Sequence, residues 1–226
     1  LPVDQSGMKT VEWAEENREH IERLVQTNGA LLIRGLKFVG SQQFGSVLST
    51  LFGSELLQYV YRSTPRTELR GNVYTATEYH PDLHIPQHNE NAYSNCWAMR
   101  LGFLCTLPSE TGGATPICDS AAVYEQIPAA VRERFERHGV LYVRNYSEID
   151  LHWKEVFQTE DRTAVEQFCH DNRLELEWLD GDRLRTRQIN QASAVHPVTG
   201  ARVWFNQAHL FHVSSLEQEI QDQLLS

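Results

Sequence analysis

The sequence lacks any uninterrupted apolar run near the roughly 20 residues that a transmembrane helix needs. Residues 1–7 show neither the charged region nor the apolar region of a signal peptide, and the first residue is not methionine. Internal repeats, low-complexity segments and linkers are also absent. With 226 residues, 41% of them hydrophobic, the chain is long enough for one domain with a substantial core. We therefore expect one soluble domain without a membrane partner, and a natural reading frame that begins before residue 1.

Positive charge is scarce and scattered along the chain. There are 20 Lys and Arg residues against 30 Asp and Glu residues, which gives a formal net charge of −10 and a pI of about 5.4. The densest basic stretch consists of Arg183, Arg185 and Arg187, whose alternation predicts one face of a strand or loop. An acidic protein without a basic cluster repels nucleic acid and anionic membranes. We exclude both as partners and assign these arginines to solvated surface, or at most to a local anchor for an anionic substrate group.

Cysteine is rare, and its spacing excludes disulfide scaffolds and zinc fingers. The four cysteines form no CxxC pair and no zinc-finger spacing, and three of them have apolar neighbours. Free cysteine in such surroundings behaves as a small buried hydrophobic residue. We therefore expect free, mostly buried thiols and a cytoplasmic location, where thiols stay reduced.

Several segments carry the periodicity of amphipathic helices. Residues 10–26 place apolar side chains at helical spacing, begin with acidic residues and end at an Asn-Gly stop. Residues 41–51 predict a second helix with Ser41 as its N-cap. Residues 120–138 predict two helices that meet near Pro128, because proline interrupts the helical hydrogen bonds. Further helices are expected at residues 161–172 and 217–225.

Short segments rich in Val, Tyr and Thr predict strands over much of the remaining chain. The apolar run at residues 30–36, bounded by glycines, predicts a buried strand. The other expected strands are residues 58–61, 72–77, 98–106, 140–146 and 201–205, the last after a turn at 197–200. Short strands with a helical layer predict a mainly β chain with flanking helices (α+β), folded as a double-stranded β-helix, the cupin-like jelly roll.

The sequence His88-Asn89-Glu90 is the sharpest chemical feature of the chain. Residues i and i+2 of a strand point to the same face, so the imidazole and the carboxylate are expected to reach one point in space. Both are ligands for divalent metals, and two histidines with one carboxylate suit non-haem iron(II). A His-x-Glu pattern alone also occurs by chance in many chains, so its context decides its meaning.

A second motif, Gly112-Gly113-Ala114-Thr115, follows after an apolar segment. Paired glycines let a ligand come close to the backbone, and the Thr115 hydroxyl can donate to a carboxylate. Taken alone, the motif favours a Gly-Gly hairpin turn with a β-branched residue opening the next strand. The pair Asp119-Ser120 predicts a helix N-cap without chemistry.

The string HNENAYSNCWAMRLGFLCTLPSETGGATPICDS, together with GALLIRGL near the start, resembles the taurine-dioxygenase (TauD/TfdA) superfamily. Residues 196–216, HPVTGARVWFNQAHLFHVSSL, are similar to a segment before the last helices of these proteins. The glutamate in His-x-Glu and the letters WFNQ look closest to the branch of syringomycin-type amino-acid hydroxylases. The resemblance covers about residues 28–216, and the order and spacing of its motifs are more specific than any one motif.

The resemblance implies a jelly roll that binds iron(II) through His88 and Glu90, with 2-oxoglutarate as cosubstrate and O2 as oxidant. Thr115 would hydrogen-bond 2-oxoglutarate. The family also uses a distal histidine as third ligand and an arginine that pairs with the far carboxylate of 2-oxoglutarate. We expect both beyond residue 226, so that the chain is one dioxygenase domain without its C-terminal part.

Other polar residues are candidates for the site. His209 or His212 could take the third ligand position, although the resemblance favours a substrate or packing role for His212. Asn91 and Tyr93 follow the His-x-Glu motif closely, and polar residues near a site often touch the substrate. Asn206 and Gln207 end an expected strand that faces the site, which suggests a substrate contact, and we count Asn206 among the candidate contacts.

These features predict an iron(II)- and 2-oxoglutarate-dependent dioxygenase that hydroxylates an unactivated C–H bond of a small molecule. The branch resemblance implies an amino acid, free or tethered to a carrier protein, in natural-product biosynthesis, and a homo-oligomer is possible. Desaturation at the same iron stays open, whereas Glu90 argues against halogenation, which needs a small residue there. A non-catalytic jelly-roll binding protein and a zinc or manganese cupin are the alternatives of other classes.

Overall fold

The computed structural model describes residues 1–61, 63–64, 66–78, 85–146, 151–216, 218 and 221–222. The chain divides into two compact units. The first consists of Leu1–Tyr59, Thr64–His80 and Met99–Gly113, and the second of Val60–Ser63, Pro81–Ala98 and Ala114–Ser226. The expectation of a single domain stays a prediction.

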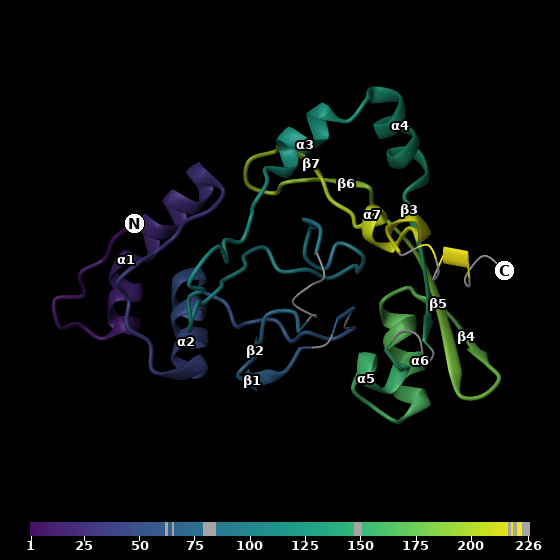
Figure 1. Ribbon diagram of the computed structural model, residues 1–226, viewed down its shortest axis with the longest axis horizontal. Coiled ribbons are helices and arrows are strands. Elements are labelled where there is room, and N and C mark those ends of the chain that lie inside the picture. Colours follow the sequence, from purple (N-terminus) through teal and green to yellow (C-terminus); the bar gives the residue numbers. More distant parts are fainter. Residues whose placement is uncertain are drawn as a thin grey trace. The chain divides into compact units, whose positions relative to one another are not determined.

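The core of the first unit lies between helices α1 (Thr10–Asn28) and α2 (Gly40–Phe52), which run side by side in Figure 1. The apolar face of α1 buries Trp13 and Ile21 against Val47 and Leu51 of α2. Gly29 ends α1 with a φ of 76°, where glycine is favoured, and its N–H donates to an α1 carbonyl. Both predicted helices are confirmed, but the N-cap of α2 is not Ser41, because the helix begins one residue earlier.

The strand predicted at residues 30–36 is wrong. Among the described residues, this segment pairs through an isolated parallel bridge between Pro2 and Arg34, in which the Val3 N–H donates to the Arg34 carbonyl at 2.8 Å. Leu31, Ile33 and Leu36 of this segment instead pack on the α1–α2 core, whereas Leu32 is exposed. A run of apolar residues reports burial and does not by itself report strand pairing. The predicted strand at 72–77 shortens to β2 (Val73–Tyr74), which pairs with β1 (Glu68–Arg70).

The second unit is built on a three-stranded antiparallel sheet with the order β3-β5-β4. Strand β3 (Val140–Tyr146) has the predicted bounds and alternates buried and exposed residues along its length. Strands β4 (Glu175–Leu179) and β5 (Arg183–Asn190) form a hairpin, and β5 contains the three alternating arginines. The alternation arises because successive side chains of a strand point to opposite faces.

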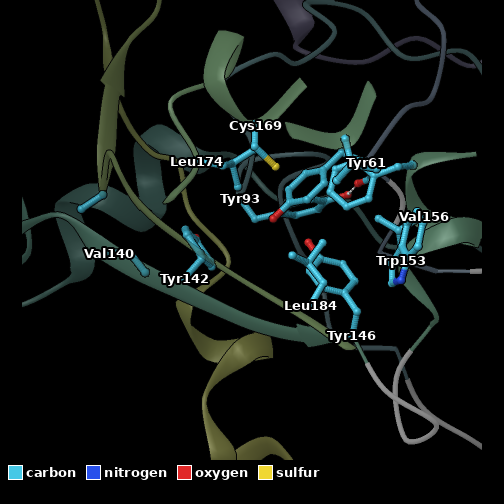
Figure 2. Close-up of a cluster of buried hydrophobic side chains, with 13 residues drawn as sticks. Tyr61, Tyr93, Val140, Tyr142, Tyr146, Trp153, Val156, Cys169, Leu174 and Leu184 are labelled. Atoms are coloured by element: carbon cyan, nitrogen blue, oxygen red, sulfur yellow. Dashed lines mark hydrogen bonds between the residues drawn. The ribbon is translucent and has the colours of Figure 1, made fainter. Parts of the chain in front are cut away.

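Aromatic residues dominate the core of this unit (Figure 2). Helices α5 (Trp153–Phe157) and α6 (Arg162–Asp171) contribute to it, and Asp161 caps α6 by accepting the Thr163 N–H at 2.9 Å. The rings of Tyr61 and Tyr93 lie 5.8 Å apart at its centre. Tyr93 is therefore packed on the same core as the sheet.

Helix α3 (Ser120–Gln126) and helix α4 (Ala129–His138) confirm the predicted break at Pro128. The side chain of Asp119 caps α3, also as predicted. The predicted turn at 197–200 is also confirmed. The strand predicted at 201–205 is confirmed as β7 (Arg202–Trp204), which pairs with β6 (Ser193–Val195). Glu136 of α4 accepts hydrogen bonds from Tyr124, Ser193 and Arg202, at 2.8–3.1 Å, and thereby joins these elements.

The described residues combine helices and strands, with more residues in helices, so the fold is mixed rather than mainly β. The strands predicted at 58–61 and 98–106 are wrong, because these segments form no ladder with other described residues. The helix predicted at 217–225 lies mostly outside the described residues. Within the described part of the chain, no helix combines the length and apolar composition needed to cross a bilayer.

The cysteines only partly match expectation. All four are free, but Cys96, Cys105 and Cys118 are exposed and only Cys169 is buried. Their apolar neighbours lie in extended segments without sheet pairing, so burial does not follow from local composition there. Burial raises the pKa of the Cys169 thiol to about 12, which leaves it protonated and unreactive at neutral pH.

Candidate functional site

His88 and Glu90 converge as the motif predicts. The Nε2 atom of His88 lies 3.6 Å from Oε2 of Glu90, and their side chains are 26% and 23% exposed. The other ring nitrogen, Nδ1, lies 2.9 Å from the Pro86 carbonyl oxygen. A carbonyl can only accept, so Nδ1 carries the hydrogen and, in the neutral ring, Nε2 presents its lone pair toward the carboxylate.

This arrangement fits a metal ion. Metal-binding histidines usually donate their second ring N–H to a carbonyl or carboxylate, which fixes both the tautomer and the ring orientation. The Pro86 carbonyl does this for His88, and Glu90 adds a carboxylate oxygen beside the exposed nitrogen. Among the described residues, no cluster of three or more His, Cys, Asp or Glu side chains could hold a metal. His88 and Glu90 could therefore serve as two of the donors to a metal ion.

The local structure that produces this convergence is not a strand. Residues 85–89 form no ladder with other described residues, and a turn follows at 90–93. Asn91 adopts a φ of 56°, which asparagine tolerates better than most residues, and the Ala92 N–H approaches the Asn89 carbonyl at 3.3 Å. Strand geometry correctly predicted that the His88 and Glu90 side chains lie close together, but the described residues around them do not form a strand.

Residues 204–209, here called the 204–209 segment, instead hold the His-x-Glu motif through hydrogen bonds between side chains and backbone carbonyls. The Asn89 amide donates to the Trp204 carbonyl at 2.8 Å and approaches the Ser120 hydroxyl at 3.4 Å. In return, the Gln207 amide donates to the Asn89 carbonyl. The His209 Nε2 atom lies 2.9 Å from the Gln87 carbonyl oxygen. Sequence reasoning missed Asn89 as a contributor, because no local pattern reveals a partner more than 100 residues away.

The predicted substrate contacts beside the motif lie in different surroundings. Tyr93 is buried in the aromatic core, and its hydroxyl donates to the Tyr61 carbonyl at 3.0 Å, with Asn91 Oδ1 at 3.3 Å. Asn91 is only partly buried and follows Glu90 directly. Substrate contacts by these two residues stay predictions.

Asn206 and His212 make mainly local hydrogen bonds. Asn206 is 2% exposed; its amide donates to the Ala192 carbonyl at 2.7 Å, and its oxygen accepts the Ala208 N–H at the start of α7 (Ala208–Phe211). The exposed His212 caps the 3-10 helix η1 (Val213–Ser215) by accepting the Ser214 N–H. Neither histidine of this region forms a described cluster with His88 and Glu90, and the substrate roles of Asn206 and His212 stay predictions.

Thr115 is exposed and lies in an extended stretch that leads to α3. No described interaction joins it to His88 or Glu90. The preceding glycines, Gly112 and Gly113, both have positive φ, 68° and 73°. A Cβ on Gly113 would lie 2.4 Å from the Ser109 hydroxyl, so glycine is required there both by backbone conformation and by space.

Tyr142 of strand β3 contacts the 204–209 segment. Its hydroxyl accepts the Gln207 N–H at 2.8 Å. Burial raises the pKa of Tyr142 to about 12, with the Gln207 N–H acting in the opposite direction. The phenol therefore stays neutral at physiological pH and serves as a fixed hydrogen-bonding group.

The fold and site thus define a mixed helix–strand protein with a paired histidine and carboxylate suited to a metal. The chain belongs to the TauD/TfdA family: residues 2–223 match the family described as taurine catabolism dioxygenase TauD, TfdA family, which confirms the resemblance seen in the motifs.

Two curated proteins are similar along most of the chain. The dapdiamide synthesis protein DdaC of Enterobacter agglomerans is 38% identical over 207 residues, which cover 91% of this chain and 63% of DdaC. A clavaminate synthase-like protein of Arabidopsis thaliana is 35% identical over 218 residues, which cover 91% of this chain and 64% of that protein. The chain therefore spans slightly less than two thirds of the length of these relatives.

Proposed function

We propose that the protein is an iron(II)- and 2-oxoglutarate-dependent dioxygenase that hydroxylates a C–H bond of a small molecule. The observation that carries this proposal is the pairing of His88 Nε2 with Glu90 Oε2 at 3.6 Å, with the imidazole fixed by the Pro86 carbonyl. This pair occurs in a chain that belongs to a dioxygenase family. A double-stranded β-helix as the complete fold is part of the proposal.

In this proposal, His88 and Glu90 hold the iron, which activates O2 when bound. The Pro86 carbonyl keeps the His88 lone pair directed toward the metal position, and the Asn89 contacts restrain the backbone between the two ligands. Thr115 donates its hydroxyl hydrogen to a carboxylate of 2-oxoglutarate. The resemblance also implies a distal histidine as the third iron ligand and an arginine that pairs with the far carboxylate of 2-oxoglutarate.

The substrate we propose is an amino acid, free or tethered to a carrier protein. Its support is the similarity to DdaC, a protein of dapdiamide synthesis, and the branch resemblance of the motifs. Asn91, Tyr93, Asn206 and His212 are the proposed contacts. Desaturation of the same substrate class is the second outcome that this site allows, because it depends on the position of the substrate hydrogen.

The test is anaerobic addition of iron(II) and 2-oxoglutarate to the full-length protein while the visible spectrum is recorded. A weak charge-transfer band is expected from 2-oxoglutarate chelated to the iron, and His88→Ala should abolish it. His170→Ala is the matched control, because His170 also lies beside a carboxylate, 3.2 Å from Asp171, but on the exposed surface of α6. A correctly folded protein that gives no band would refute the dioxygenase and favour a non-catalytic binding protein.

A further inference from the structure

Gln207 is an unusual residue to bury. It is 3% exposed, and a buried amide must find hydrogen-bond partners or lose stability. Its side chain donates to the backbone carbonyl of Asn89, the residue between the two metal-ligand candidates. Its own backbone N–H is satisfied separately by the Tyr142 hydroxyl at 2.8 Å. The Gln207 side chain therefore bonds to the His-x-Glu motif and is not needed to satisfy its own backbone N–H.

The contact is reciprocal. The Asn89 amide donates to the Trp204 carbonyl at 2.8 Å, three residues before Gln207. His209 adds a third hydrogen bond to the Gln87 carbonyl at 2.9 Å. Residues 87–89 and the 204–209 segment are thus joined by three hydrogen bonds.

These hydrogen bonds are important for the geometry of the motif because residues 85–89 form no sheet ladder with other described residues. In a strand, backbone bonds to both neighbours would fix the direction of each side chain. At residues 87–89 the described bonds to the 204–209 segment come from side chains. His88 and Glu90 flank Asn89, so a change in the Asn89 peptide would change the directions of both ligand side chains.

We propose that Asn89 and Gln207 are positioning residues that hold His88 and Glu90 in the geometry that binds the metal. This inference rests on the proposed function and deepens it by assigning the geometry of the site to a buried pair of amides. Such outer-shell partners typically contribute about 10- to 100-fold to metal affinity. The competing explanation is that the two amides only stabilise the fold.

The experiment compares Asn89→Ala and Gln207→Met with Gln5→Met in the full-length protein. Gln5 is the control because it lies in the first unit, whereas the motif belongs to the second. It is partly buried, its amide donates to the Thr10 hydroxyl at 3.0 Å, and its oxygen accepts the Lys37 N–H at 2.9 Å. Anaerobic calorimetry gives the Kd for iron(II), thermal unfolding gives Tm, and hydrogen exchange reports on peptides covering residues 85–94. Asn89 is only partly buried, so its variant keeps the test valid if Gln207→Met does not fold.

The proposal predicts that Asn89→Ala and Gln207→Met raise the Kd for iron(II) about 10- to 100-fold and speed exchange at residues 85–94. Gln5→Met should lower Tm and leave both the Kd for iron(II) and the exchange at residues 85–94 unchanged. If the two variants bind iron(II) as the wild type does, the positioning role is wrong while the proposed function stands. If the wild-type protein itself binds no iron(II), both the proposed function and the positioning role are refuted.

Discussion

The two motifs of the site are held in different ways. Residues 87–93 bond through side chains and carbonyls to the 204–209 segment and to the end of β5, where the Asn190 amide donates to the Tyr93 carbonyl at 2.6 Å. Residues 114–118 are exposed, and no side-chain hydrogen bond to another described residue holds them. Contacts inside this chain thus specify the geometry of His88 and Glu90, whereas the role of Thr115 rests on the resemblance.

The largest expected effect is on the affinity for iron(II), measured without the cosubstrate. His88→Ala should weaken iron(II) binding by more than about 100-fold, because a lost ligand costs more than a lost outer-shell partner. Anaerobic calorimetry with iron(II) alone measures this. Glu90→Gln should also weaken binding, since the amide keeps the shape but loses the charge. Unchanged affinity in both variants would show that the pair is not a metal site.

Thr115→Val tests the exposed motif. Loss of one hydrogen bond to a charged carboxylate should lower the affinity for 2-oxoglutarate about 10-fold, while iron(II) binding and Tm stay unchanged. Thr111→Val, an exposed threonine four positions earlier, is the control. Titration of the iron-loaded protein with 2-oxoglutarate measures the difference, and equal affinities in the two variants would reject the role of Thr115.

Much of the local structure could be predicted from the sequence. The helices of α1 and α2, the break at Pro128 and the bounds of β3 follow from periodicity, proline chemistry and alternation, all of which act over a few residues. The strands at 30–36 and 98–106 were predicted wrongly, because ladder formation depends on a partner elsewhere in the chain. Extended apolar segments and strands look alike in sequence.

The same limit applies to the site. His88 and Glu90 are two residues apart, so their convergence could be predicted from the sequence. The contact between Asn89 and Gln207 could not, because it joins segments 118 residues apart. The letters FNQ belonged to the resembling segment, but nothing in them indicates that the amide of Gln207 supports the metal motif rather than the substrate.

Tyr93→Phe tests whether residues beside the motif serve the fold or the substrate. Its hydroxyl donates to the Tyr61 carbonyl in the core, so removing it should lower the free energy of unfolding by about 1–3 kcal/mol, the cost of an unsatisfied buried acceptor. Urea unfolding measures this loss. If the hydroxyl also contacts substrate, the KM will rise in the same variant; a KM equal to that of the wild type would remove Tyr93 from the predicted substrate contacts.

The smallest expected effect concerns Tyr142, whose hydroxyl accepts the Gln207 N–H of the 204–209 segment. The pKa of Tyr142 is raised from 10.0 to about 12 in the folded protein, chiefly by burial. Its contribution to stability is fully present below the unfolded pKa and is lost as pH rises through the folded pKa, because the unfolded phenol ionises first. Tyr142→Phe should therefore lower stability at neutral pH, where Gln207 loses its acceptor, but flatten the decline above pH 10. Urea unfolding at increasing alkaline pH measures both slopes. Equal slopes in the two proteins would show that burial of Tyr142 does not govern alkaline stability.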